Sequence, residues 1–121
     1  MKLFNSNQTI PTFKEVLEVI DGKVPFILEY KLDVVSTKVC QLSNELLNSY
    51  KGLYCIESFH PLALIWYKKN RPDVIRGQLS MHYWKEKKHF GNIALMFMTF
   101  LLCNFLTRPD FIAYDQEDLN N

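Results

Sequence analysis

Short apolar runs alternate with helix-like stretches along the chain. The apolar runs contain β-branched and aromatic residues without a helical period, which predicts buried strands over residues 24–32, 53–59, 74–79 and 111–114. Apolar residues at helical spacing, or in one long apolar run, predict helices over residues 13–20, 39–50, 62–70 and 90–106. Regular alternation of helices with short apolar strands indicates right-handed crossovers and a parallel sheet, and therefore an α/β fold.

The first predicted helix has signals at both of its ends. Thr12 and Glu15 form a capping-box pattern, in which each side chain accepts a hydrogen bond from the backbone of the other. Asp21 and Gly22 end the helix after an apolar stripe that consists of Phe13, Val16, Leu17 and Ile20. We expect a short amphipathic helix.

The next two helices have weaker boundary signals. Gly52 is expected to cap the second helix, whose core-facing side is predicted to consist of Val39, Leu42, Leu46 and Tyr50. Pro61 suits the first position of the third helix, because that position needs no backbone N–H, and Pro72 stops it.

The size of the repeating unit bears on the architecture. Each helix and strand unit occupies roughly 25 to 35 residues, close to one eighth of the about 250 residues of a (β/α)8 barrel. Four strands do not close such a barrel. The periodicity therefore fits either an open sheet that is complete in itself or a part of a barrel whose other strands lie outside residues 1–121.

Composition and charge narrow the function only a little. A net charge of +1 gives no overall bias toward nucleic acid. Cys40, Cys55 and Cys103 lack CxxC spacing and a His at ligand spacing, so we expect buried, reduced thiols in a cytoplasmic protein. The N-terminus lacks the apolar segment of a signal peptide, and the apolar run 93–106 is shorter than the roughly 20 residues that span a bilayer.

Glu29 and Lys31 are the strongest candidates for a functional pair. Side chains alternate between the two faces of a strand, so these two project to one side while Tyr30 projects to the other. Both lie late in their strand, and parallel α/β folds bind ligands at the carboxyl ends of their strands. A mutual salt bridge, or simple solvent exposure, explains the same spacing without a function.

Polar residues also follow the other strands, at positions 57–60, 77–80 and 115–118. An unperturbed imidazole titrates near neutral pH, so His60 is a candidate general base, although it precedes a helix start and has no identifiable partner. The basic segment 85–89 suits a phosphate or peripheral contact with an anionic lipid surface, or is a solvated charge run. Asp115, Glu117 and Asp118 fit either a cation-binding site or a solvated polar segment without a function.

Five segments form an ordered set of motifs: PTFKEVL at 11–17, PFILEYK at 25–31, CIESFHP at 55–61, RPDVIRGQL at 71–79 and RPDFIAY at 108–114. In order and spacing they resemble the middle of bacterial glycerophosphodiester phosphodiesterases. The resemblance covers nearly the whole chain, and several ordered motifs are more specific than any single one.

The resemblance implies a partial (β/α)8 TIM barrel, with the four strands as the fourth to the seventh and residues 1–121 as one domain truncated at both ends. It implies hydrolysis of glycerophosphodiesters to glycerol 3-phosphate and an alcohol, with a divalent metal, Mg²⁺ or Ca²⁺, as cofactor. By position, Glu29 takes the role of a metal ligand and Lys31 that of a phosphate contact. This suits a hard cation, which prefers carboxylate oxygen, and a Lys that offsets phosphoryl charge.

Several family motifs are absent from the sequence: His-Arg-Gly, a Glu-x-Asp metal pair, a His-Asp and a final strand with Trp. The two histidines of these motifs are the acid and base of the family, and His60, His82 and His89 do not lie in their places. We therefore expect the chain by itself to be inactive and to self-associate through an open sheet edge. The alternative is a non-catalytic module that binds a phosphorylated ligand, a lipid head group or another chain.

Overall fold

Strands and helices alternate in the computed structural model, which describes residues 2, 4, 6–32, 36–80 and 104–114. Residues 104–107 are also helical. The elements in chain order are α1 (Phe13–Ile20), β1 (Phe26–Tyr30), α2 (Lys38–Leu47), β2 (Tyr54–Ser58), α3 (Pro61–Asn70), β3 (Arg76–Ser80) and β4 (Phe111–Tyr114).

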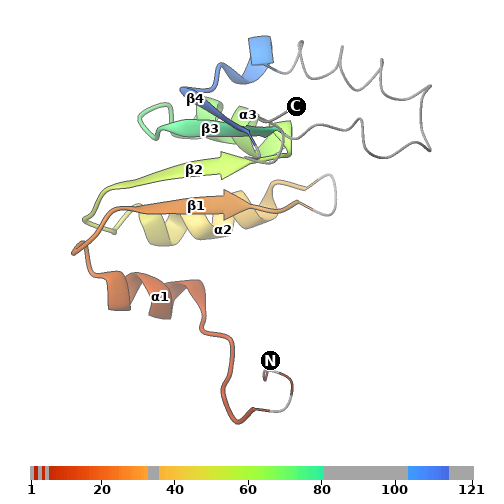
Figure 1. The fold of residues 1–121 in the computed structure, drawn as a ribbon. Coiled ribbons are helices and arrows are strands. Elements are labelled where there is room, and N and C mark those ends of the chain that lie inside the picture. The colour runs from red at the N-terminus through yellow and green to blue at the C-terminus, as the bar shows by residue number, and fades with distance from the viewer. Residues whose placement is uncertain (1, 3, 5, 33–35, 81–103, 115–121) are drawn as a thin grey trace.

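The four strands form one parallel sheet in the order β1-β2-β3-β4 (Figure 1). The expected α/β class and the parallel sheet are therefore confirmed. Strands that are sequential and parallel occur in a segment of a barrel and equally in an open sheet. The (β/α)8 barrel accordingly stays a proposal.

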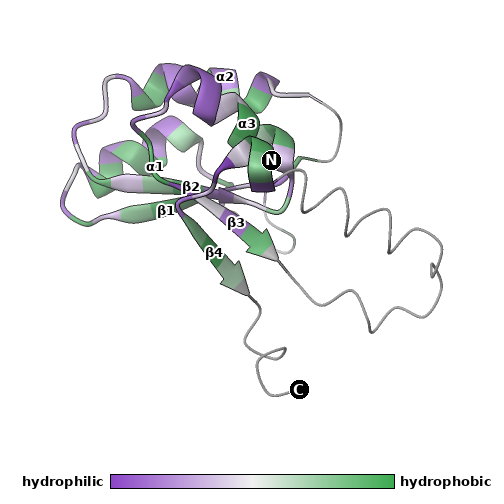
Figure 2. Ribbon diagram, turned by 90° about the horizontal axis from the view of Figure 1, so that it is seen from above, coloured by the Kyte–Doolittle hydropathy of each residue, from purple (hydrophilic) through white to green (hydrophobic). Residues whose placement is uncertain are grey.

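The core lies between the sheet and two helices. Helices α2 and α3 cover one face of the sheet, and the strands turn progressively across it with the usual twist (Figure 2). Ile27 projects to the opposite face of β1 and is 61% exposed. Alternate strand residues face the helices, and the buried cluster there consists of Tyr30, Cys40, Ile56, Ala63, Leu64, Tyr67 and Val74.

The boundary signals of α1 and α3 are confirmed. Thr12 accepts a hydrogen bond from the backbone N–H of Glu15 at 3.3 Å, and the Thr12 N–H donates to the Glu15 carboxylate at 2.6 Å. Asp21 caps α1 in the left-handed conformation. Pro61 is the first residue of α3, and β4 has the expected bounds. The other strands start one or two residues later than predicted, because their first residues have no ladder partner.

The predicted face of the second helix is wrong. Val39 and Leu42 are 48% and 53% exposed, while Cys40 and Leu47 are buried. The helix ends at Leu47, five residues before Gly52. Polar residues interrupt the apolar stripe on the inward face of α2, so the sequence pattern does not indicate that face. These polar side chains hydrogen-bond across the core.

One of these residues is Ser43, whose hydroxyl contacts the buried hydroxyl of Tyr30. The Tyr30 hydroxyl also lies 2.6 Å from that of Tyr67 on α3. Burial raises the pKa of both tyrosines, so both are neutral in the folded protein near neutral pH. The hydroxyls satisfy one another in a space that excludes water, and this ties β1 to both covering helices.

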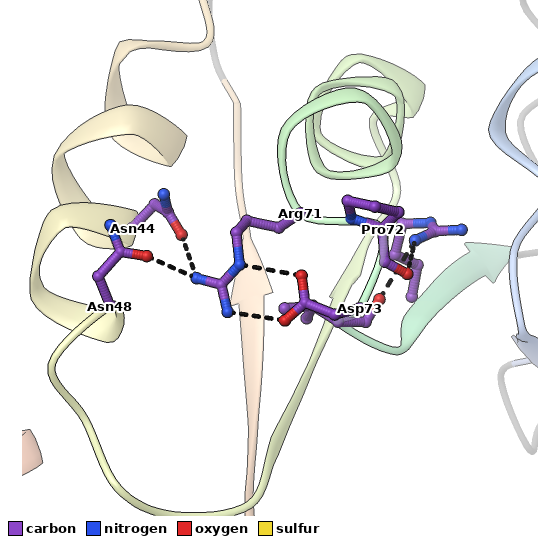
Figure 3. A network of polar contacts seen from close by, with 7 residues as sticks. Asn44, Asn48, Arg71, Pro72 and Asp73 are labelled. Carbon is purple, nitrogen blue, oxygen red and sulfur yellow. Dashed lines mark hydrogen bonds and ion pairs between the residues drawn. The ribbon is translucent and has the colours of Figure 1, made fainter.

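Arg71 ties α2 to the segment after α3 (Figure 3). Its guanidinium donates at 2.8 Å to the side-chain oxygens of Asn44 and Asn48 on α2. It also donates to both carboxylate oxygens of Asp73, at 3.1 and 2.9 Å. This hydrogen bonding holds the pKa of Asp73 below its usual value. A planar donor fork suits this task better than a lysine would.

Several sequence-based candidates lie outside the described residues: the segment 85–89, the histidines His82 and His89, most of the apolar run 93–106, Cys103, and the acidic residues Asp115, Glu117 and Asp118. Within the described part of the chain, no helix is long and apolar enough to cross a membrane. Cys40 and Cys55 are both free thiols there; Cys40 is buried as predicted, whereas Cys55 is only half-buried.

Candidate functional site

The carboxylate of Glu29 and the ammonium of Lys31 meet on the face of the sheet opposite α2 and α3, which is the uncovered face within the residues that the structure describes. Glu29 is the fourth residue of β1, and Lys31 follows the strand directly. The Lys31 Nζ lies 3.8 Å from Glu29 Oε1, and the two side chains are 78% and 34% exposed. This is the predicted salt bridge in a loose, exposed form, which contributes little to stability. The Lys31 ammonium therefore stays accessible to an anionic ligand.

Glu57 completes a group of three charges at this place. It is the register partner of Glu29 on the neighbouring strand β2, so the two side chains project to the same face from adjacent parallel strands. Partial burial, and then the negative charge of Glu29, raise the pKa of Glu57. Two carboxylates so close repel each other, and a cation placed beside them would relieve this repulsion.

Sequence reasoning placed Glu57 among the strand-end polar residues but did not pair it with Glu29. A signal was present, because Glu29 and Glu57 occupy the same position in two five-residue strands, FILEY and YCIES. Equal positions become neighbours only if the strands pair without an offset. That register is a tertiary property, and the sequence of either strand alone does not contain it.

An aromatic ring borders the row of carboxylates on the β4 side. Gly77 on β3 is the register partner of Glu57, and Phe111 on β4 is the partner of Gly77. A Cβ added at Gly77 would lie 2.2 Å from the Phe111 ring, so that ring lies directly over the glycine. On one side of the two glutamates lies the edge of β1, which has no strand partner among the described residues, and on the other side lies the Phe111 ring.

The donor chemistry at this face fits a hard divalent cation only in part. Carboxylate oxygens are the ligands that Mg²⁺ and Ca²⁺ prefer, but these ions take six or more oxygen ligands. Glu29 and Glu57 supply two carboxylates. Within the residues that the structure describes, no group of three or more His, Cys, Asp or Glu side chains is placed to hold a metal. These side chains therefore fit as a portion of a metal site and not as a complete one.

His60 has a structural partner that sequence reasoning did not identify. It is the N-cap of α3, and its Nδ1 accepts a hydrogen bond from the backbone N–H of Leu62 at 3.2 Å. The same lone pair would be needed to accept a proton from a substrate at Nδ1. A capping function, which stabilises the start of α3, accounts for this histidine without catalysis.

Comparison with known proteins found no relative of this chain. No family model, no curated protein and no solved structure matches the chain. The class that the structure supports is an α/β fold with four parallel strands in one sheet. The likeness to the phosphodiesterases rests on the sequence motifs.

Proposed function

We propose that this chain is the part of a glycerophosphodiester phosphodiesterase that carries the fourth to the seventh strand of a (β/α)8 barrel. The complete enzyme would hydrolyse glycerophosphodiesters to glycerol 3-phosphate and an alcohol in the cytoplasm. The observation that carries the proposal is the pair Glu29 and Lys31 at the carboxyl end of a strand in a parallel sheet, within the motif PFILEYK.

Each residue of the pair has a role in this proposal. Glu29 contributes one carboxylate to a divalent cation, and Lys31, exposed beside it, contacts the phosphoryl oxygens of the substrate. The cation, when bound, would polarise the phosphoryl group and orient the attacking water. The remaining ligands and the acid and base histidines must come from strands that carry the missing motifs.

The proposal predicts that the chain alone does not turn over substrate. Purified chain would be mixed with glycerophosphocholine and Mg²⁺ or Ca²⁺, and glycerol 3-phosphate would be measured by phosphorus NMR. We expect no product until a second fragment is assembled with it, one that bears the His-Arg-Gly, Glu-x-Asp and His-Asp strands of a family member. In that assembly, Glu29→Gln and Lys31→Met are expected to abolish turnover.

The matched control is Glu18→Gln, which removes an exposed carboxylate on α1, away from the sheet. This variant should keep full turnover. Turnover by the chain alone contradicts the proposal, as does turnover in the assembly that is insensitive to Glu29→Gln. A cheaper observation precedes this experiment: DNA upstream of the first codon should encode the His-Arg-Gly, Glu-x-Asp and His-Asp motifs.

A second candidate function is a non-catalytic module that binds a phosphorylated ligand. The observation that favours it is the high exposure of Lys31 in a chain whose sequence lacks the acid and base histidines of the family. Titration with glycerol 3-phosphate in the presence of EDTA distinguishes the two. Metal-independent binding that Lys31→Met removes would support the binding module.

A further inference from the structure

Tyr30, the residue between Glu29 and Lys31, is anchored on the helix side of the sheet. Its hydroxyl contacts Ser43 and Tyr67, and its backbone carbonyl accepts a hydrogen bond from the Ser58 hydroxyl at 2.7 Å. Because successive strand residues point to opposite faces, fixing Tyr30 also determines how its two charged neighbours project.

Ser58 connects several elements at the carboxyl edge of the sheet. It is fully buried, and its hydroxyl, which donates to the Tyr30 carbonyl, also accepts from the backbone N–H of His60 at 3.0 Å. The Ser58 carbonyl accepts from the side-chain amide of Gln78 on β3 at 3.3 Å. The ends of three strands and the start of α3 are thus joined through one small side chain and its backbone.

The place of this bond in the ladder gives it a particular effect. Tyr30 and Ser58 form the last register pair of β1 and β2, directly after the pair of Glu29 and Glu57. Like charges opposite each other on neighbouring strands push the strands apart. The Ser58 hydroxyl supplies a buried cross-strand bond at the next position, where it opposes that separation.

We propose that Ser58 is a positioning residue, which keeps the carboxylates of Glu29 and Glu57 side by side on the uncovered face. The assignment of this pair to a ligand site rests on the proposed function, whereas the positioning itself does not. Without the hydroxyl, the ends of β1 and β2 separate, water enters between them, and the two carboxylates move apart.

The test is the proton–proton nuclear Overhauser contact between the Glu29 and Glu57 side chains, measured by NMR on the full chain and on Ser58→Ala. In the unaltered chain, the two side chains should show this contact, because they are register partners on adjacent strands and project to the same face. In Ser58→Ala, we expect this contact to be lost, while the contacts between the earlier register pairs of β1 and β2 remain.

Ser43→Ala is the matched control, because it removes a hydroxyl contact from Tyr30 on the helix side and leaves the Ser58 bond in place. It should keep the contact between the Glu29 and Glu57 side chains, because Tyr67 still contacts the Tyr30 hydroxyl. If Ser58→Ala folds too poorly for this measurement, Ser58→Cys replaces it, since a thiol has similar size and is a weak donor. A contact between the Glu29 and Glu57 side chains that persists without the Ser58 hydroxyl, or that is lost equally in Ser43→Ala, overturns the proposal. Neither result depends on phosphodiesterase activity, so the two proposals can fail separately.

Discussion

Replacing Arg71 with Ala is expected to lower the free energy of unfolding by about 3 to 4 kcal/mol. Arg71 connects two segments that are more than 20 residues apart in sequence, and it does so through four hydrogen bonds from one guanidinium (Figure 3). Its side chain is 21% exposed, so most of it is removed from water. Truncation would leave Asn44, which is partly buried, without its donor.

The magnitude follows from the separate contacts. Hydrogen bonds to a charged group contribute about 1.5 to 3 kcal/mol each, and the bonds to Asn44 and Asn48 fall at the lower end because Asn48 is exposed. The Asp73 side chain is 65% exposed, so that ion pair is discounted to roughly 0.2 to 1 kcal/mol. Arg71→Lys keeps the charge but cannot reach both sides, and it should recover less than half of the loss.

The assay is urea unfolding followed by far-ultraviolet circular dichroism, with Lys69→Ala as control. Lys69 is an exposed residue in the last turn of α3, and its removal should change stability by less than about 0.5 kcal/mol. The pKa of Asp73 is lowered in the fold, so its stabilising contribution is present above its unfolded-state pKa and is lost as the pH falls through its folded-state pKa. The effect of Arg71→Ala should therefore shrink in acid. A loss under about 0.5 kcal/mol at neutral pH would refute the reasoning.

Three further predictions concern the tyrosine network, the carboxylate pair and the sheet edges. Burial raises the pKa of Tyr67, so stability should fall as the pH rises above about 10; Tyr67→Phe should make this fall shallower, as urea midpoints at several pH values would show. Glu57→Gln removes the repulsion by Glu29 and should stabilise the protein by about 0.2 to 1 kcal/mol at neutral pH; a destabilised variant in thermal unfolding would argue against the pair. Within the described residues, β1 and β4 each have one neighbouring strand, so gel filtration should show self-association that Ile27→Lys reduces; a clean monomer would contradict this.

The local features of this fold follow from the sequence because they depend on neighbouring residues. The capping box of Thr12 and Glu15 and the start of α3 at Pro61 are predicted where the structure has them, and the strand that carries Glu29 is predicted two residues too long at each end. Each depends on contacts within one turn of helix or on the alternation of side chains along one strand.

The features that define the candidate site were decided by the tertiary structure. The partnership of Glu29 with Glu57 depends on the register of two strands, and the inward side of α2 depends on Ser43 and Asn44 finding partners on β1 and after α3. In these cases the stabilising partner lies far away in sequence. The sequence pattern of one segment indicates which of its residues share a face. Only the packed fold determines which other residues that face contacts.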